Sequence, residues 1–188
     1  MKNLRNIAFL FFVFAQTFSA QNYNIACDKI LNCSDCNKAL PIFGSGEYNF
    51  SCLPKGNGDI LEISNNSNKS KYFAKEHNTV WLKFKAEHTA FFSLKLIPNN
   101  LEYDLDFALF KLDTNNYCEN IRTKKLEPIR ANNCRNDKSI QSKTGTSLQA
   151  ENEFIPAGPG ENYSKVIQVK KGDSLLLVID NVYYGQEG

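Results

Sequence analysis

The sequence predicts an all-β fold: an antiparallel, jelly-roll-like β-sandwich preceded by an irregular, disulfide-rich N-terminal segment. Short runs in which apolar and polar residues alternate, at residues 80–86 and 90–97, are typical of strands with one buried face. Turn signals rich in asparagine, proline and glycine separate such runs. No long stretch has the periodicity of an amphipathic helix, so packed sheets are the architecture that the pattern favours.

Residues 102–113, EYDLDFALFKLD, are predicted to form the strand around which the sandwich is built. Successive strand side chains point to opposite faces, so Asp104, Asp106 and Phe110 share one face and Leu109 lies on the other. Apolar residues on both faces indicate an interior strand. The two carboxylates then lie at the start of this strand, where the core meets the loops.

Residues 1–20 are predicted to be a secretory signal peptide, with Lys2 and Arg5 before an apolar run at 7–15 and small residues ahead of a cut near Gln21. The remaining 168 residues correspond to one domain, residues 21–188. Because two of the 22 basic residues leave with the signal, the mature chain has equal numbers of basic and acidic residues. That balance argues against a nucleic-acid partner. The mature chain has no second long apolar run, so we expect no transmembrane segment in it.

Six cysteines follow the predicted cleavage site. An even number in an exported chain is typical of a disulfide framework rather than a metal site. The pair Cys33-x-x-Cys36 has zinc-like spacing, but it lacks a second pair, and His77 and His88 stand alone. We therefore expect disulfides among the six cysteines, Cys27, Cys33, Cys36, Cys52, Cys118 and Cys134.

The other elements are expected in the following order. Helical turns are expected around 28–32 and 35–40, and strands at 47–50 and 60–63. Residues 80–86 and 90–97, joined by a three-residue break, are expected to form a β-hairpin. A strand at 126–131 and a long polar stretch at 132–162 follow, and a second hairpin, 163–169 with 173–182, closes the chain.

The sequence contains no motif that is typical of a catalytic site. The sequence has no GxSxG, HExxH, P-loop or GxGxxG pattern, and two scattered histidines give little support for a nucleophile and base pair. We therefore expect a protein that is not an enzyme. Tyr183 and Tyr184 are candidates for a sugar-binding platform, although core or hydrogen-bonding roles are more common for tyrosine.

Asp104 and Asp106 have two possible roles. They are candidate ligands for a calcium ion, joined by Asp180 from the closing hairpin, because calcium takes six to eight oxygen ligands. The alternative is structural: Asp106 caps a turn and Asp104 is solvated. The spacing lacks the dense D-x-D-x-D-G pattern of a dedicated calcium loop, so it favours the structural role. Calcium is the one cofactor that the sequence suggests.

Three stretches carry a resemblance to a known family: TVWLKFKA at 79–86, YDLDFALFKL at 103–112, and AGPGENYSKVIQVKKGDSLLLVIDNVYYG at 157–185, with Cys118 and Cys134 between the last two. Together they resemble a secreted β-sandwich module of Bacteroidetes cell-envelope proteins, which is similar to CUB-like and pre-peptidase C-terminal domains. Such modules are often N-terminal to an OmpA-like domain or part of adhesins exported by the type IX system.

The resemblance implies a non-catalytic module for binding, adhesion or spacing, located in the periplasm, on the outer membrane surface or outside the cell. Its partner would be an unknown surface, glycan or envelope-protein ligand. The alternative is an accessory domain that targets a secreted hydrolase to carbohydrate or protein. The resemblance also implies a Cys118–Cys134 disulfide. We expect the other four cysteines to pair among themselves within 27–52. The family's final strand is absent, so we expect residues 174–182 to have one uncovered edge.

Overall fold

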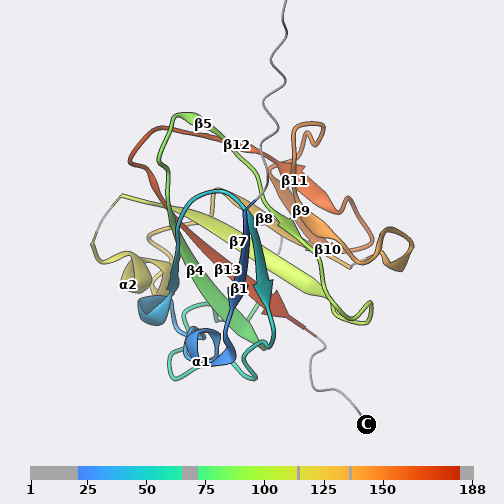
Figure 1. Ribbon diagram of the computed structural model, residues 1–188, viewed down its shortest axis with the longest axis horizontal. Helices are drawn as coiled ribbons and strands as arrows, with labels where there is room; N and C mark the ends of the chain where they lie inside the picture. The colour runs from blue at the N-terminus through green and yellow to red at the C-terminus, as the bar shows by residue number, and fades with distance from the viewer. Residues whose placement is uncertain (1–20, 65–71, 114, 136, 183–188) are drawn as a thin grey trace, which may run out of the picture.

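A six-stranded mixed sheet forms the centre of the computed structural model, which describes residues 21–64, 72–113, 115–135 and 137–182 (Figure 1). Its four inner strands pair antiparallel, and the strand at each edge pairs parallel with its neighbour. The expected antiparallel arrangement therefore holds only for the inner strands. The strands in spatial order are β10 (Phe154–Gly158), β8 (Arg130–Cys134), β7 (Leu105–Leu112), β13 (Ser174–Asn181), β4 (Thr79–Lys85) and β2 (Leu40–Ile42).

Three smaller sheets accompany the main one, and none of the sheets in the described residues closes into a barrel. Strands β1 (Asn22–Ile25) and β3 (Glu47–Phe50) pair parallel, and β12 (Ile167–Val169) pairs antiparallel with β5 (Ala90–Phe92). The third has the order β11 (Tyr163–Lys165), β9 (Thr144–Ser147) and β6 (Lys95–Leu96). The short helices are α1 (Cys27–Ile30), η1 (Cys36–Lys38), α2 (Tyr117–Arg122) and η2 (Lys138–Ile140).

Both faces of the main sheet are covered, because its inner strands are apolar on both sides. One face packs Phe107, Leu109 and Leu177 against side chains from the smaller sheets, including Phe50 and Phe92. The other face is covered by helical and irregular segments. Its cluster contains the aromatic and aliphatic residues Trp81, Phe110, Leu176, Val178, Ile63, Tyr72 and Phe73, with Ile121 from α2.

Strand β7 confirms the prediction of an interior strand at 102–113, since it lies between β8 and β13. The expectation of an uncovered edge on the last predicted strand is wrong. Strand β13 pairs with β7 along one edge and with β4 along the other. Residues Leu175–Ile179 are an unbroken apolar run, and such a run is stable only where both sheet faces are buried.

The two predicted hairpins are also wrong. Strand β5 pairs with β12 rather than with β4, and β6 pairs with β9. Strands β11 and β12 do not pair with β13, which uses β4 and β7. The helical turns around 28–32 and 35–40 are confirmed by α1 and η1, whereas residues 60–63 contain no strand.

Two disulfides correct the expected pairing. Cys27 bonds Cys52, as the grouping within 27–52 allows, but Cys36 bonds Cys118 across 82 residues. Cys33 and Cys134 are buried free thiols. Cys118 packs with the cluster that contains Ala131, and the alternation along β8 turns Cys134 to the opposite face. A Cys118–Cys134 bridge would therefore have to cross the sheet.

The predicted signal peptide and the two tyrosines at 183 and 184 lie outside the described residues. Within the part of the chain that the structure describes, no helix has the length and apolar character needed to cross a membrane.

Candidate functional site

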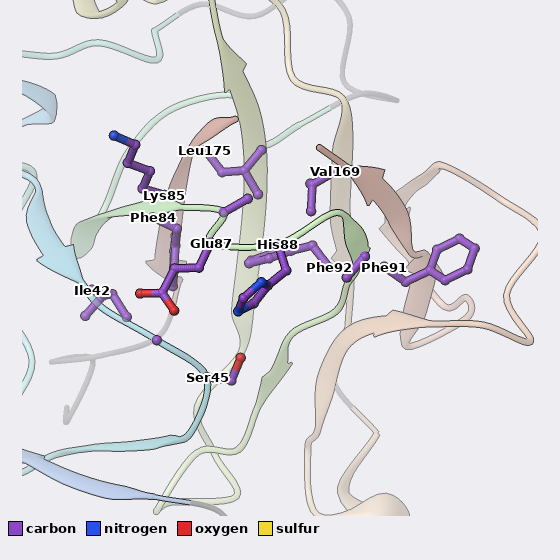
Figure 2. Close-up of a pocket in the computed structure, with 13 residues that line it drawn as sticks. Ile42, Ser45, Phe84, Lys85, Glu87, His88, Phe91, Phe92, Val169 and Leu175 are labelled. Carbon is purple, nitrogen blue, oxygen red and sulfur yellow. The ribbon is translucent and has the colours of Figure 1, made fainter. Parts of the chain in front are cut away.

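A cleft of about 160 Å³ opens where the turn after β4 meets the loop between β2 and β3 (Figure 2). Its floor is mostly apolar. The floor residues come from five strands of two sheets: Ile42 in β2, Phe84 in β4, Ala90 and Phe92 in β5, Val169 in β12 and Leu175 in β13.

The cleft exists because the chain leaves the main sheet at Ala86. The backbone N–H of Ala86 donates to the carbonyl of Asp173, and the N–H of Gly172 donates back to the Ala86 carbonyl. This pair of bonds ends β4 and directs residues 87–89 outward before β5 begins. The rings of Phe84 and Phe92 meet edge to face with centroids 5.5 Å apart, which fixes the bottom of the cleft.

Polar side chains stand at the rim of the cleft. Figure 2 shows His88 over the middle of the opening, with Glu87 to one side and the Ser45 hydroxyl below it. Lys85 lies at the periphery, and the ring of Phe91, which is 63% exposed, points away from the His88 side. The rim thus offers one carboxylate, one ammonium, an imidazole and a hydroxyl, with no surplus of either sign of charge.

A row of polar side chains crosses the opposite, α2-covered face of the sheet near its end. Asp180 in β13 is directly paired with Asp106 in β7 and with Thr79 in β4. Asp180 is fully buried, and its Oδ1 accepts hydrogen bonds from the backbone N–H groups of His77 and Asn78 at 2.8 Å each. The His77 Nδ1 lies 2.6 Å from Asp180 Oδ2.

The calcium hypothesis for Asp104, Asp106 and Asp180 is not supported by this geometry. Both oxygens of Asp180 are engaged by His77 and Asn78. Burial, together with the charges of Asp104 and Asp180, raises the pKa of Asp106 well above its usual value, so its surroundings favour the protonated carboxyl. Among the described residues, no three His, Cys, Asp or Glu side chains are grouped to hold a metal ion.

The turn-cap role for Asp106 is corrected as well. Asp106 lies inside β7, and its Oδ1 is buried without a hydrogen-bond partner in the described structure. The sequence did place Asp180 correctly, since the closing strand brings it beside Asp106.

Two buried glutamates continue the acidic row. Glu62 Oε1 accepts from the backbone N–H of Cys36 at 3.0 Å, and Glu76 Oε1 accepts from Ile63 N–H at 3.1 Å. Burial raises the pKa of Glu62 to about 7, with a contribution from the Asp35 charge. Burial also raises the pKa of Glu76 to about 9, reinforced by the charges of Glu62 and Asp180.

Sequence reasoning missed these glutamates and treated His77 and His88 as isolated. Glu62 falls in a segment predicted as a strand, where a single glutamate carries no sign of burial. Glu76 and His77 come a few residues before the apolar run at 80–82, which is a weak signal that they enter the core with it.

Comparison with known proteins adds no assignment. No family model matches the chain, and neither a curated protein nor a solved structure matches it.

Proposed function

We propose that this chain is an exported, non-catalytic β-sandwich module that binds a glycan through the cleft of Figure 2, with one sugar ring seated on its floor. The observation that carries the proposal is the combination of an apolar floor with a polar rim of balanced charge. Binding sites for small ligands commonly combine these two features.

The volume of the cleft fits a single ring. A cavity of roughly 150 Å³ takes up benzene, so about 160 Å³ accommodates one six-membered ring. A pyranose has an apolar C–H face for Phe92 and Val169, and hydroxyls at its edge for Glu87, His88 and Ser45. A rim that carries one positive and one negative side chain does not favour a strongly anionic ligand such as nucleic acid.

Export is supported by the two disulfides, since disulfides persist mainly in oxidising compartments. The resemblance to modules of Bacteroidetes envelope proteins supports the same location and a role in adhesion or in spacing next to a partner domain. The accessory domain of a secreted hydrolase would use the same cleft to hold a carbohydrate target.

A cleft-filling variant tests the proposal. Ala90 is exposed on the cleft floor, so Ala90→Trp should occupy the volume of the ring without disturbing the core. Ala157, which is also exposed on a strand but lies in β10 away from the cleft, provides the matched control Ala157→Trp. The residue 21–188 chain and both variants would be applied to an array of bacterial, plant and animal glycans.

We expect the unmodified chain and Ala157→Trp to retain the same glycans, and Ala90→Trp to lose at least tenfold in affinity. An array with no retained glycan, or equal binding by Ala90→Trp, would contradict the proposal. Competition by a peptide with an aromatic side chain, but by no sugar, would assign the cleft to a protein partner instead.

A further inference from the structure

The irregular segment 56–64 is attached to the α2-covered face of the sheet by buried carboxyls, independently of the cleft. Asp35 Oδ1 accepts from the backbone N–H groups of Asp59 and Ile60, at 2.8 and 2.9 Å. Glu62 reaches back to Cys36, and Glu76 forms a reciprocal pair with Ile63, whose carbonyl accepts from the Glu76 N–H.

These three carboxyls differ in electrostatic setting. Burial alone would raise the pKa of Asp35, but Lys38 and the backbone donors of Ile60 and Asp59 outweigh it and lower that pKa, so Asp35 is ionised. Glu62 and Glu76 are only 3% and 4% exposed. Neither has a cation in hydrogen-bond contact among the described residues, and the Oε2 atom of each is buried without a partner there.

We propose that Glu62 and Glu76 form a protonation-dependent latch that holds segment 56–64 against the sheet, closed while both carboxyls carry protons and opening as they ionise. The latch is a device of the fold itself and does not depend on the proposed glycan site. Its output is the exposure of the apolar cluster beneath the segment, which includes Ile63 and the fully buried Trp81.

The charges that face the latch determine the direction of the effect. Glu62 faces Asp35 and Lys38, and Glu76 faces Glu62 and Asp180. Beyond Asp180, which pairs with His77, lies the buried Asp106 with its own neighbour Asp104. Ionised Glu62 and Glu76 would therefore add two negative charges to a series of carboxylates that, among the described residues named here, is opposed by Lys38 and by His77 when protonated.

The sign of the pH effect follows from proton binding. In the closed state Glu76 keeps its proton up to a pKa of about 9, whereas the released side chain ionises near 4.5. The stabilisation is thus fully present below about pH 4.5 and is lost as the pH rises through about 9. Glu62 contributes in the same direction up to about pH 7. For each proton that is released on opening, the equilibrium constant for opening rises about tenfold per pH unit.

Amide hydrogen exchange tests the latch in the intact chain between pH 6 and 8, after correction for the intrinsic exchange rate. The reporters are the amides of Ile63 and Cys36, which donate to the two glutamates. The amide of Leu177 in β13 reports global unfolding. Emission from Trp81, the only tryptophan in the sequence, gives a second readout of opening.

We expect the protection of the Ile63 amide to fall about a hundredfold between pH 6 and 7, where both carboxyls release protons on opening, and about tenfold between pH 7 and 8. Trp81 emission should shift to the red, and the protection of Ile63 should stay below that of Leu177 at every pH, because the latch opens without global unfolding. The double variant Glu62→Gln/Glu76→Gln imitates the protonated carboxyls and should flatten the profile. Glu151→Gln, an exposed control, should leave the profile unchanged.

Three results would overturn the proposal: constant protection of Ile63 in the unmodified chain, equal protection of Ile63 and Leu177 across the pH range, or the same slope in the double variant. If the double variant does not fold, the profile of the unmodified chain and that of Glu76→Gln alone decide in the same way.

Discussion

The Cys36–Cys118 disulfide should contribute more stability than the Cys27–Cys52 disulfide, because it closes a far longer loop. The two bridges span sequence separations of 82 and 25 residues. In the chain-entropy model these loops correspond to about 4.5 and about 3.5 kcal/mol. For a domain of this size, we expect Cys36→Ala/Cys118→Ala to lower the melting temperature by roughly 9–18 °C. The Cys27→Ala/Cys52→Ala variant should lose roughly 7–14 °C.

The assay combines thermal unfolding with peptide mapping under non-reducing conditions. Cys33→Ala is the matched control, since Cys33 is buried but forms no disulfide, and it should cost only about 1 kcal/mol. Mapping should recover a peptide pair joined through Cys36 and Cys118, and two free thiols after denaturation. A recovered Cys118–Cys134 link, or a smaller loss in Cys36→Ala/Cys118→Ala than in Cys27→Ala/Cys52→Ala, would refute the reasoning.

Three further substitutions test the buried polar row and one tight contact. Asp180→Ala removes the acceptor for two backbone N–H groups and the partner of the His77 ring. Urea unfolding should therefore show a free energy of unfolding that is lower by about 3–5 kcal/mol. A decrease of less than about 1 kcal/mol would contradict the assigned hydrogen bonds. Asp106→Asn imitates the protonated carboxyl, whose pKa is raised, so it should change stability by less than about 1 kcal/mol at pH 4 and stabilise the protein at pH 9. Destabilisation at pH 9 would show that the fold favours the ionised aspartate and that its pKa is not raised. Gly145→Ala places a Cβ against the Leu94 carbonyl, at a residue whose φ is +151°. The free energy of unfolding should fall by about 2 kcal/mol or more, which circular dichroism would detect as a lower melting temperature. An unchanged melting temperature would mean that β6 and β9 are not in this contact.

The sequence predicted the strands whose apolar residues occupy both faces, because such a pattern has few other stable arrangements. The 102–113 run is the clearest case, and β7 occupies its middle. The alternation of Val80 and Leu82 against Trp81 is likewise found, with the two sets on opposite faces of the sheet. These are local properties that each strand carries in its own residues.

Strand pairing was predicted poorly, because it depends on segments distant in sequence. The hairpin rule assumes that neighbouring runs pair, which holds in about two-thirds of cases. Here β5 pairs with β12 and β4 pairs with β13, and in both cases the partner is more than 70 residues away in the sequence. The side chains of Phe92 and Leu175 pack into the same core, so burial of these residues favours the long-range pairing over the local one.

The site residues were predicted unevenly for a similar reason. Asp106 and Asp180 were placed together because each lies on a strongly apolar strand. Glu62 lies on an irregular segment, where nothing in the local sequence distinguishes a buried glutamate from a solvated one. The cleft is assembled from five strands, and none of its rim residues belongs to a recognisable motif.

Binding at the cleft is tested most directly by nuclear magnetic resonance on the isotopically labelled 21–188 chain, titrated with a soluble oligosaccharide retained on the array. Glycan binding in the cleft predicts saturable shifts of the amides of Glu87, His88, Ala90 and Val169, which Ala90→Trp abolishes and Ala157→Trp preserves. Shifts confined to other surfaces, or the same cleft shifts in Ala90→Trp, would contradict a glycan-binding cleft.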